Sequence, residues 1–95
     1  MACSLAEAEF RERRGGILRK VRDAVEEAKE VEGGYAYRFR PDKNFIVELA
    51  GMVNLESQCC PFLRFRMTVE PGGGPIWLEM TGPQGTRDFL ASIFD

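Results

Sequence analysis

The sequence contains no histidine, and this absence excludes several kinds of chemistry at once. Without an imidazole there is no histidine general acid or base, no Ser-His or Cys-His nucleophile pair, and no metal site that needs a histidine ligand. Any catalytic or metal-binding role must therefore rest on side chains other than histidine.

The chain also lacks an excess of positive charge and a long apolar run. Its 13 lysines and arginines are outnumbered by 15 aspartates and glutamates, for a formal net charge of −2. Phosphate binding usually needs a basic excess, so the charge argues against a nucleic-acid partner. No apolar run approaches the roughly 20 residues that cross a bilayer, and residues 1–7 lack the basic and apolar stretches of a secretory signal. We therefore expect a cytoplasmic protein with no membrane partner.

Cysteine is scarce, with three residues in all, and its placement is informative. Three cysteines in a chain without an export signal fit a reducing compartment, where thiols stay free. Cys3 stands apart near the N-terminus, whereas Cys59 and Cys60 are neighbours. A disulfide between neighbours would close a strained ring, so we do not expect these two to be bridged to each other.

Size and composition are those of an ordinary globular chain. The 95 residues are 44% hydrophobic and 29% charged, which fits one small domain over residues 1–95 with a modest core.

The N-terminal third predicts a helix. Ser4 and Glu7 have capping-box spacing, so the helix can begin near Leu5. Gly15 and Gly16 interrupt it, which predicts a kink or a delayed start, and the glycine pair at 33–34 can end it. The apolar stripe that defines this helix comprises Ile17, Leu18, Val21, Val25, Ala28 and Val31. A basic cluster precedes an acidic run on the same helix, and we interpret both as a solvated, charge-laced surface; the basic residues are Arg11, Arg13, Arg14, Arg19, Lys20 and Arg22.

Two further elements follow. Residues 35–40 alternate apolar and polar side chains, which predicts a half-buried strand. Pro41 and Asp42 end this strand and open a second helix that runs to Cys60, because the residue before Pro61 is disfavoured in helical geometry. Its apolar face carries Phe45, Leu49, Met52 and Val53.

The clearest prediction is a hairpin formed by residues 63–70 and 76–81 around the turn at 71–74. Facing residues of an antiparallel pair lie on the same side of the sheet. This condition predicts the pairs Val69–Ile76, Met67–Leu78 and Phe65–Met80 on one face, with Arg66–Glu79 and Thr68–Trp77 on the other. Beyond the hairpin, residues 81–86 lead into a last helix that carries Phe89, Leu90, Ile93 and Phe94.

These elements predict a two-layer α+β fold in the order α-β-α-β-β-α. A helix joins the first two strands, which favours a right-handed crossover. We expect a three-stranded mixed sheet of order 1-3-2, with residues 76–81 in the centre, antiparallel to both neighbours, and the helices on one face. The other face would present Trp77 among charged side chains. One interpretation is a homodimer contact around Trp77, and the other is a lone, partly exposed tryptophan with an arginine over its ring.

The most reactive side chains gather where the second helix ends. Glu56 and either Cys59 or Cys60 fall on one side of this helix, with Met52 one turn earlier. Sulfur donors favour Zn(II), Cu(I) or Hg(II) over Mg or Ca. The sequence thus predicts a metal site made of Cys59, Cys60 and Glu56, in which tetrahedral zinc needs one further ligand from water or a partner chain. Packing in the core is the alternative, and thiol catalysis is a third.

Electrostatics weigh against catalysis at this helix end. A helix C-terminus is partially negative and Glu56 adds negative charge, both of which disfavour a thiolate. Arg64 is the only nearby candidate to offset them, so we expect the thiols to be poor nucleophiles without a metal. The glycine-containing turn at 81–85 matches no phosphate-loop pattern, and we interpret it as a plain strand-to-helix connection.

The segment from Glu56 to Phe65, the Gly74-Pro75 exit from the hairpin and the turn from Thr81 to Gly85 resemble a family of short uncharacterised bacterial proteins. That family carries a Glu-Arg-x-Cys-Cys-Pro-Phe-x-x-Phe motif and a Thr-Gly-Pro-x-Gly turn, and the resemblance covers roughly the last two thirds of the chain. It implies no established activity, and an association of some members with heavy-metal resistance would favour the metal interpretation. Ser57 stands where the family has arginine, which removes one means of stabilising a thiolate.

Overall fold

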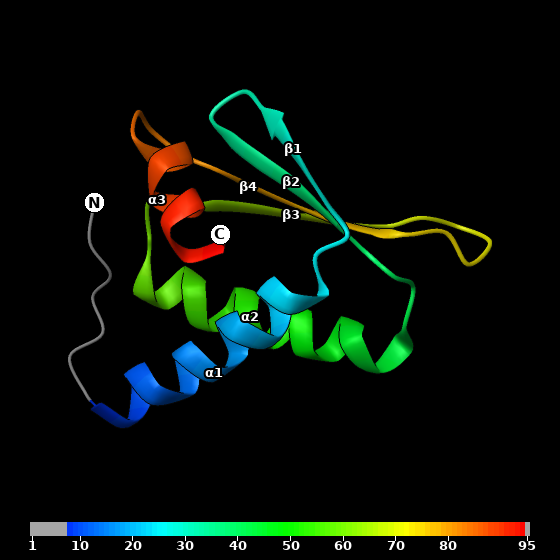
Figure 1. Ribbon diagram of the computed structural model, residues 1–95, viewed down its shortest axis with the longest axis horizontal. Helices are drawn as coiled ribbons and strands as arrows, with labels where there is room; N and C mark the ends of the chain where they lie inside the picture. Colours follow the sequence, from blue (N-terminus) through cyan, green and yellow to red (C-terminus); the bar gives the residue numbers. More distant parts are fainter. Residues whose placement is uncertain (1–7, 95) are drawn as a thin grey trace.

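The computed structural model describes residues 8–94, which form three helices and one four-stranded antiparallel sheet (Figure 1). Helix α1 spans Ala8–Ala24, α2 spans Lys43–Cys59 and α3 spans Thr86–Phe94. The strands are β1 (Glu27–Val31), β2 (Gly34–Phe39), β3 (Arg64–Val69) and β4 (Ile76–Thr81). Cys3 and the proposed capping box of Ser4 and Glu7 lie outside the described residues.

The α+β class is confirmed, but the sheet differs from the expected one in two respects. Its order is β1-β2-β4-β3, so the three predicted strands have the relative order that we expected and β1 is an additional edge strand. The antiparallel pairing of residues 76–81 with both neighbours is confirmed, but every neighbouring pair is antiparallel, so the description of the sheet as mixed is wrong. The two strands joined by α2 run parallel to each other, but β4 lies between them.

The first predicted helix is too long. Helix α1 ends at Ala24, and residues 27–31 pair with β2 through the tight turn at Glu32 and Gly33. Gly33 has a φ of 81°, so this glycine serves a hairpin turn rather than a helix end. The predicted delayed start at Gly15 and Gly16 is also wrong, because α1 begins before these glycines and continues through them. A Cβ at either glycine would meet no atom within 4 Å.

The hairpin of β3 and β4 has the predicted register at all five predicted pairs. Val69, Met67 and Phe65 face residues of β4 on the core side, while Arg66 and Thr68 face β4 on the other side. The turn contains Gly72 and Gly73 with φ values of 68° and 76°, which suit glycine.

The core lies between one face of the sheet and the helices. Ring contacts link the layers: Tyr37 of β2 stacks on Phe94 of α3 at 4.8 Å, and Phe39 of β2 meets Phe45 of α2 at 5.2 Å between ring centroids. Figure 1 shows α1 and α2 side by side beneath the sheet, and α3 packs against β2. The buried side chains that form this core cluster are Leu18, Val21, Tyr37, Phe39, Leu49, Met52, Cys59, Cys60, Leu63, Ile76, Leu78, Met80 and Leu90. Among the described residues, no helix is long and apolar enough to span a membrane.

Candidate functional site

The three predicted site residues converge at the C-terminal end of α2. Asp42 caps the other end of this helix by accepting hydrogen bonds from the N–H groups of Asn44 and Phe45. The helix ends at Cys59, and the N–H of Cys60 still donates to the carbonyl of Glu56 at 2.7 Å. Pro61 follows at once, which explains why the helix stops here.

Helical spacing turns Glu56, Cys59 and Cys60 toward the core. Glu56 is 1% exposed, and both cysteines are 0% exposed. Met52, one turn earlier on the same face, is also buried. A carboxylate in such a place needs a partner, because burying an unpaired charge is costly.

Arg14 of α1 is that partner. Its Nε donates to Glu56 Oε2 at 2.5 Å and its Nη2 donates to Oε1 at 2.9 Å, which makes a two-pronged ion pair between helices that pack together. The Arg14 side chain is only 19% exposed. The expectation of a wholly solvated basic cluster is therefore wrong for Arg14.

The same guanidinium also lies near the sulfur of Cys60. Arg14 Nη2 lies 4.0 Å from Cys60 Sγ. The pKa of Arg14 is raised above its ordinary value, chiefly by the hydrogen bonds with Glu56. Burial of the guanidinium lowers this pKa, and the charges of Glu56 and Cys59 raise it. Arg64, the candidate cation from the sequence, is exposed in β3.

The two sulfurs are close but not bonded to each other. Cys59 Sγ lies 3.6 Å from Cys60 Sγ, far beyond the roughly 2.05 Å of an S–S bond, so the predicted absence of a bridge between these neighbours is confirmed. Glu56 Oε1 lies 3.9 Å from Cys60 Sγ. Cys59 is a buried thiol, whereas Cys60 is disulfide-bonded, so the expectation that the thiols stay free does not hold for Cys60.

Two features of this disulfide-bonded form of the protein oppose metal binding. The disulfide occupies Cys60, and Arg14 occupies both oxygens of Glu56. Accordingly, within residues 8–94 no group of three or more histidine, cysteine, aspartate and glutamate side chains is arranged to hold a metal ion. The predicted ligands are gathered in one place, but they are engaged by other groups.

The ion pair of Arg14 with Glu56 was not predicted from the sequence, although the spacing of Arg14 in α1 indicates a core-facing position. Arg14, Leu18 and Val21 follow one another at steps of four and three, so Arg14 continues the buried stripe of α1. Glu56 likewise interrupts the apolar face of α2. Two opposite charges on the core-facing sides of two helices are a reason to expect a buried ion pair.

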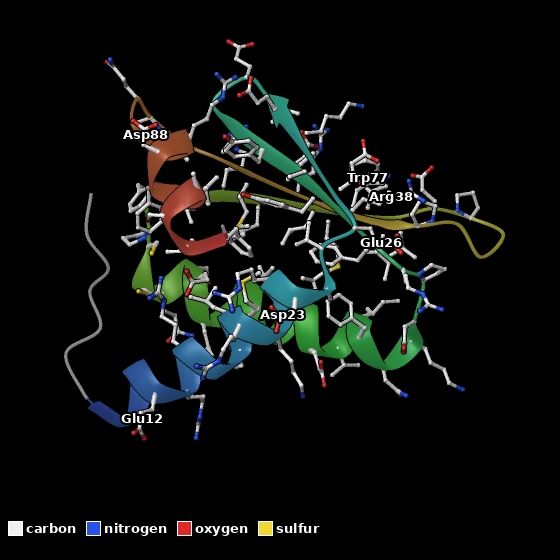
Figure 2. The ribbon with its side chains drawn as sticks, in the orientation of Figure 1. Glu12, Asp23, Glu26, Arg38, Trp77 and Asp88 are labelled. Atoms are coloured by element: carbon white, nitrogen blue, oxygen red, sulfur yellow. The ribbon has the colours of Figure 1, made fainter. Side chains whose placement is uncertain are left out.

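The second predicted feature, the sheet face that carries Trp77, lies opposite the helices. Arg38 and Trp77 are register partners there, and the guanidinium Nε of Arg38 is 3.7 Å from a carboxylate oxygen of Glu26 (Figure 2). The cation over the tryptophan ring is Lys29, at 5.7 Å from the centroid, rather than an arginine. A shallow hollow of about 280 Å³ adjoins the ring, and its lining residues are Lys29, Val31, Ala36, Thr68, Glu70, Trp77 and Glu79.

Comparison with known proteins assigns no family to this arrangement. No protein-family model matches the chain, and neither a curated protein nor a solved structure gives a significant match. The resemblance to the Cys-Cys-Pro-Phe proteins therefore stays a prediction.

Proposed function

We propose that the reduced protein binds one soft or borderline metal ion, such as Zn(II), Cu(I) or Hg(II), through Cys59 and Cys60. The observation that carries this proposal is the 3.6 Å separation of the two sulfurs. Two thiolates bound to one tetrahedral ion at about 2.3 Å would lie about 3.8 Å apart. The sulfurs thus stand close to that spacing in the state in which Cys60 is disulfide-bonded, and reduction of this disulfide has to precede metal binding.

The surroundings suit a soft ion. The site lies in the apolar core, and its nearest charged groups are Glu56 and Arg14. Glu56 serves either as a third ligand or as the group that orients Arg14. Because thiolates must be available, the activity belongs to a reducing compartment, and we propose a cytoplasmic location on this ground.

Thiol titration tests the proposal. Reduced, anaerobic protein is reacted with an aromatic disulfide reagent, with and without one equivalent of each metal. We expect bound metal to slow the reaction of Cys59 and Cys60, and a Cys59→Ser/Cys60→Ser variant to lose this metal-dependent protection. Thiol reactivity that stays unchanged at saturating metal would contradict the proposal.

A second candidate is a partner-binding module that forms a homodimer through the sheet face around Trp77. The favouring observation is the hollow beside the half-buried Trp77, together with charges of both signs on that face, Lys29 and Arg66 against Glu79. A surface that carries both signs can pair with a second copy of itself. In this function the cysteines belong to the core alone.

A further inference from the structure

The outer edge of β3 carries features that a second copy of this chain can use. Within residues 8–94, β3 pairs with β4 alone, so no strand of the sheet covers its other edge. The hairpin of β3 and β4 also extends past the ends of the helices (Figure 1). Val69 is 54% exposed, although it lies on the core side of the sheet. A strand edge of this kind can pair with a strand of another chain.

The backbone of β3 determines which residues can bond to a further strand. The N–H of Glu70 donates to the carbonyl of Pro75 at 3.2 Å, which turns the backbone of Glu70 toward β4. Backbone groups of successive residues alternate between the two sides of an antiparallel strand. The N–H and C=O groups of Phe65, Met67 and Val69 therefore face away from β4. These three residues supply the hydrogen-bonding groups of the outer edge.

One antiparallel register of two β3 strands suits this edge. In this register, Met67 of one copy faces Met67 of the other, and Phe65 faces Val69. Each outward N–H of one copy then meets an outward carbonyl of the other. The exposed side chain of Val69 is covered by Phe65 of the second copy, because facing residues lie on the same side of the sheet.

The side chains on the other side of β3 match in the same register. Arg64 of one copy lies opposite Glu70 of the other, and Arg66 lies opposite Thr68. All four side chains are exposed in the single chain. Two-fold symmetry makes each pair occur twice, and no like charges lie directly opposite each other. The edge is thus complementary to itself in charge as well as in backbone groups.

The neighbouring registers lose these matches. If Arg66 faces its own copy, two like charges lie opposite each other. That register also needs the N–H of Leu63, which already donates to the carbonyl of Cys60 at 3.0 Å. If Thr68 faces its own copy, the outermost hydrogen-bonded pair includes Pro71, which has no N–H. A shift by a single residue of one strand would set core-side residues against residues of the other side.

We propose that two copies of this chain associate through the outer edges of β3, antiparallel and with Met67 on the two-fold axis. The two four-stranded sheets then form one continuous sheet, and the helices of both copies lie on the same side of it. This edge dimer does not depend on metal binding, and it differs from a contact through the sheet face around Trp77. The six residues of β3 are fewer than the roughly 20–30 residues a side of a standard interface, so we expect the edge dimer to dissociate on dilution.

Sedimentation equilibrium over a range of protein concentrations tests the register through the charges. All samples contain a reducing agent, so that disulfides do not link copies. Arg64→Glu sets like charges opposite each other at two symmetric positions and is expected to weaken the edge dimer by on the order of tenfold. Glu70→Arg is expected to have the same effect. Arg13→Glu makes the same change as Arg64→Glu at an exposed position of α1 and is the matched control, with affinity expected to stay near wild type.

An equimolar mixture of the two single variants gives the sharpest comparison. In a mixed dimer of Arg64→Glu with Glu70→Arg, both symmetric positions again pair opposite charges. The mixture is therefore expected to dimerise more tightly than either variant alone, to within about threefold of wild type. An effect of the substitutions on the fold of the single chain would not be reversed by mixing.

A backbone variant tests the hydrogen bonds of the edge. Met67→Pro removes an N–H that faces away from β4, a position at which strand edges accept proline. It is expected to abolish the edge dimer while the far-ultraviolet circular dichroism stays that of wild type. If Met67→Pro does not fold, the charge variants decide.

Three outcomes would overturn the proposal. The first is a wild-type protein that stays monomeric up to about 1 mM. The second is a dimer that Trp77→Glu disrupts but the variants of Arg64 and Glu70 do not, which would support the face contact instead. The third is a mixture of the two charge variants that associates no better than each variant alone.

Discussion

Arg14 and Glu56 lie 42 positions apart in the chain and are joined by two hydrogen bonds across the contact between α1 and α2. The pair is buried on the carboxylate side and adjoins two buried sulfurs. The expected behaviour of the site follows from this relationship.

Removing one member of the pair is expected to destabilise the fold strongly. Arg14→Met leaves Glu56 charged and buried, which costs about 3–5 kcal/mol of unfolding free energy. Urea denaturation of the reduced protein measures this change. The matched control is Lys20→Met, because Lys20 forms an exposed pair with Glu48 across the same two helices, and surface pairs contribute about 0–1 kcal/mol.

Replacing both members is expected to restore most of that stability. Arg14→Met/Glu56→Met removes the two charges together and leaves apolar groups of similar length, which is often neutral for a buried pair. The same denaturation experiment gives the coupling energy of the pair. Additive losses in the double variant would show that the ion pair is not what holds these side chains.

Gly34 is expected to be the least replaceable glycine of the sheet. A Cβ at this position would lie 1.9 Å from the carbonyl oxygen of Met80, which is backbone of the central strand and cannot move aside cheaply. Gly34→Ala is therefore expected to cost about 3 kcal/mol or more, at the upper end of overpacking effects. Gly15→Ala is the control in α1, where a Cβ meets nothing, and it is expected to stabilise the helix by about 0.5–1 kcal/mol. Equal effects of the two substitutions would contradict the close approach of β2 and β4.

A substitution at Trp77 tests the second candidate function, the homodimer, independently of the metal site. If the sheet face forms a homodimer, Trp77→Glu is expected to convert a dimer to a monomer in analytical ultracentrifugation. Glu12→Lys changes an exposed charge on α1, outside that face, and is expected to leave the dimer intact. A wild-type protein that sediments as a monomer at every concentration would contradict the homodimer proposal.

The hairpin was predictable because its sequence leaves only one register. Sliding Met67 by one position would set apolar side chains against charged ones along the whole of β3 and β4, and the structure has the predicted pairs. The end of α2 was predictable for a local reason as well, since Pro61 acts on the residue before it.

Strand β1 could not be predicted from local pattern. Its sequence, Glu-Ala-Lys-Glu-Val, favours a helix by propensity, and four of its five residues are exposed, so no alternation marks a strand. Ala28 and Val31 continued the helical spacing of α1 by coincidence. Pairing with β2, through backbone hydrogen bonds that depend on distant residues, overrides this preference.

The candidate site was predictable only in part. Spacing on α2 places Glu56 beside Cys59 and Cys60, and this much is local. The partner of Glu56 comes from α1, where the spacing of Arg14 from Leu18 and Val21 places it on the buried stripe. That spacing does not say which residue Arg14 meets, because the contact with Glu56 depends on how α1 packs against α2.

Native mass spectrometry of reduced, anaerobically purified protein tests the central claim most directly. Wild type and the Cys59→Ser/Cys60→Ser variant are compared as purified and after addition of one equivalent of zinc, copper(I) or mercury(II). The account predicts one bound ion per wild-type chain and none in the variant. A metal-free wild type under all of these conditions, or equal binding by the variant, would contradict it.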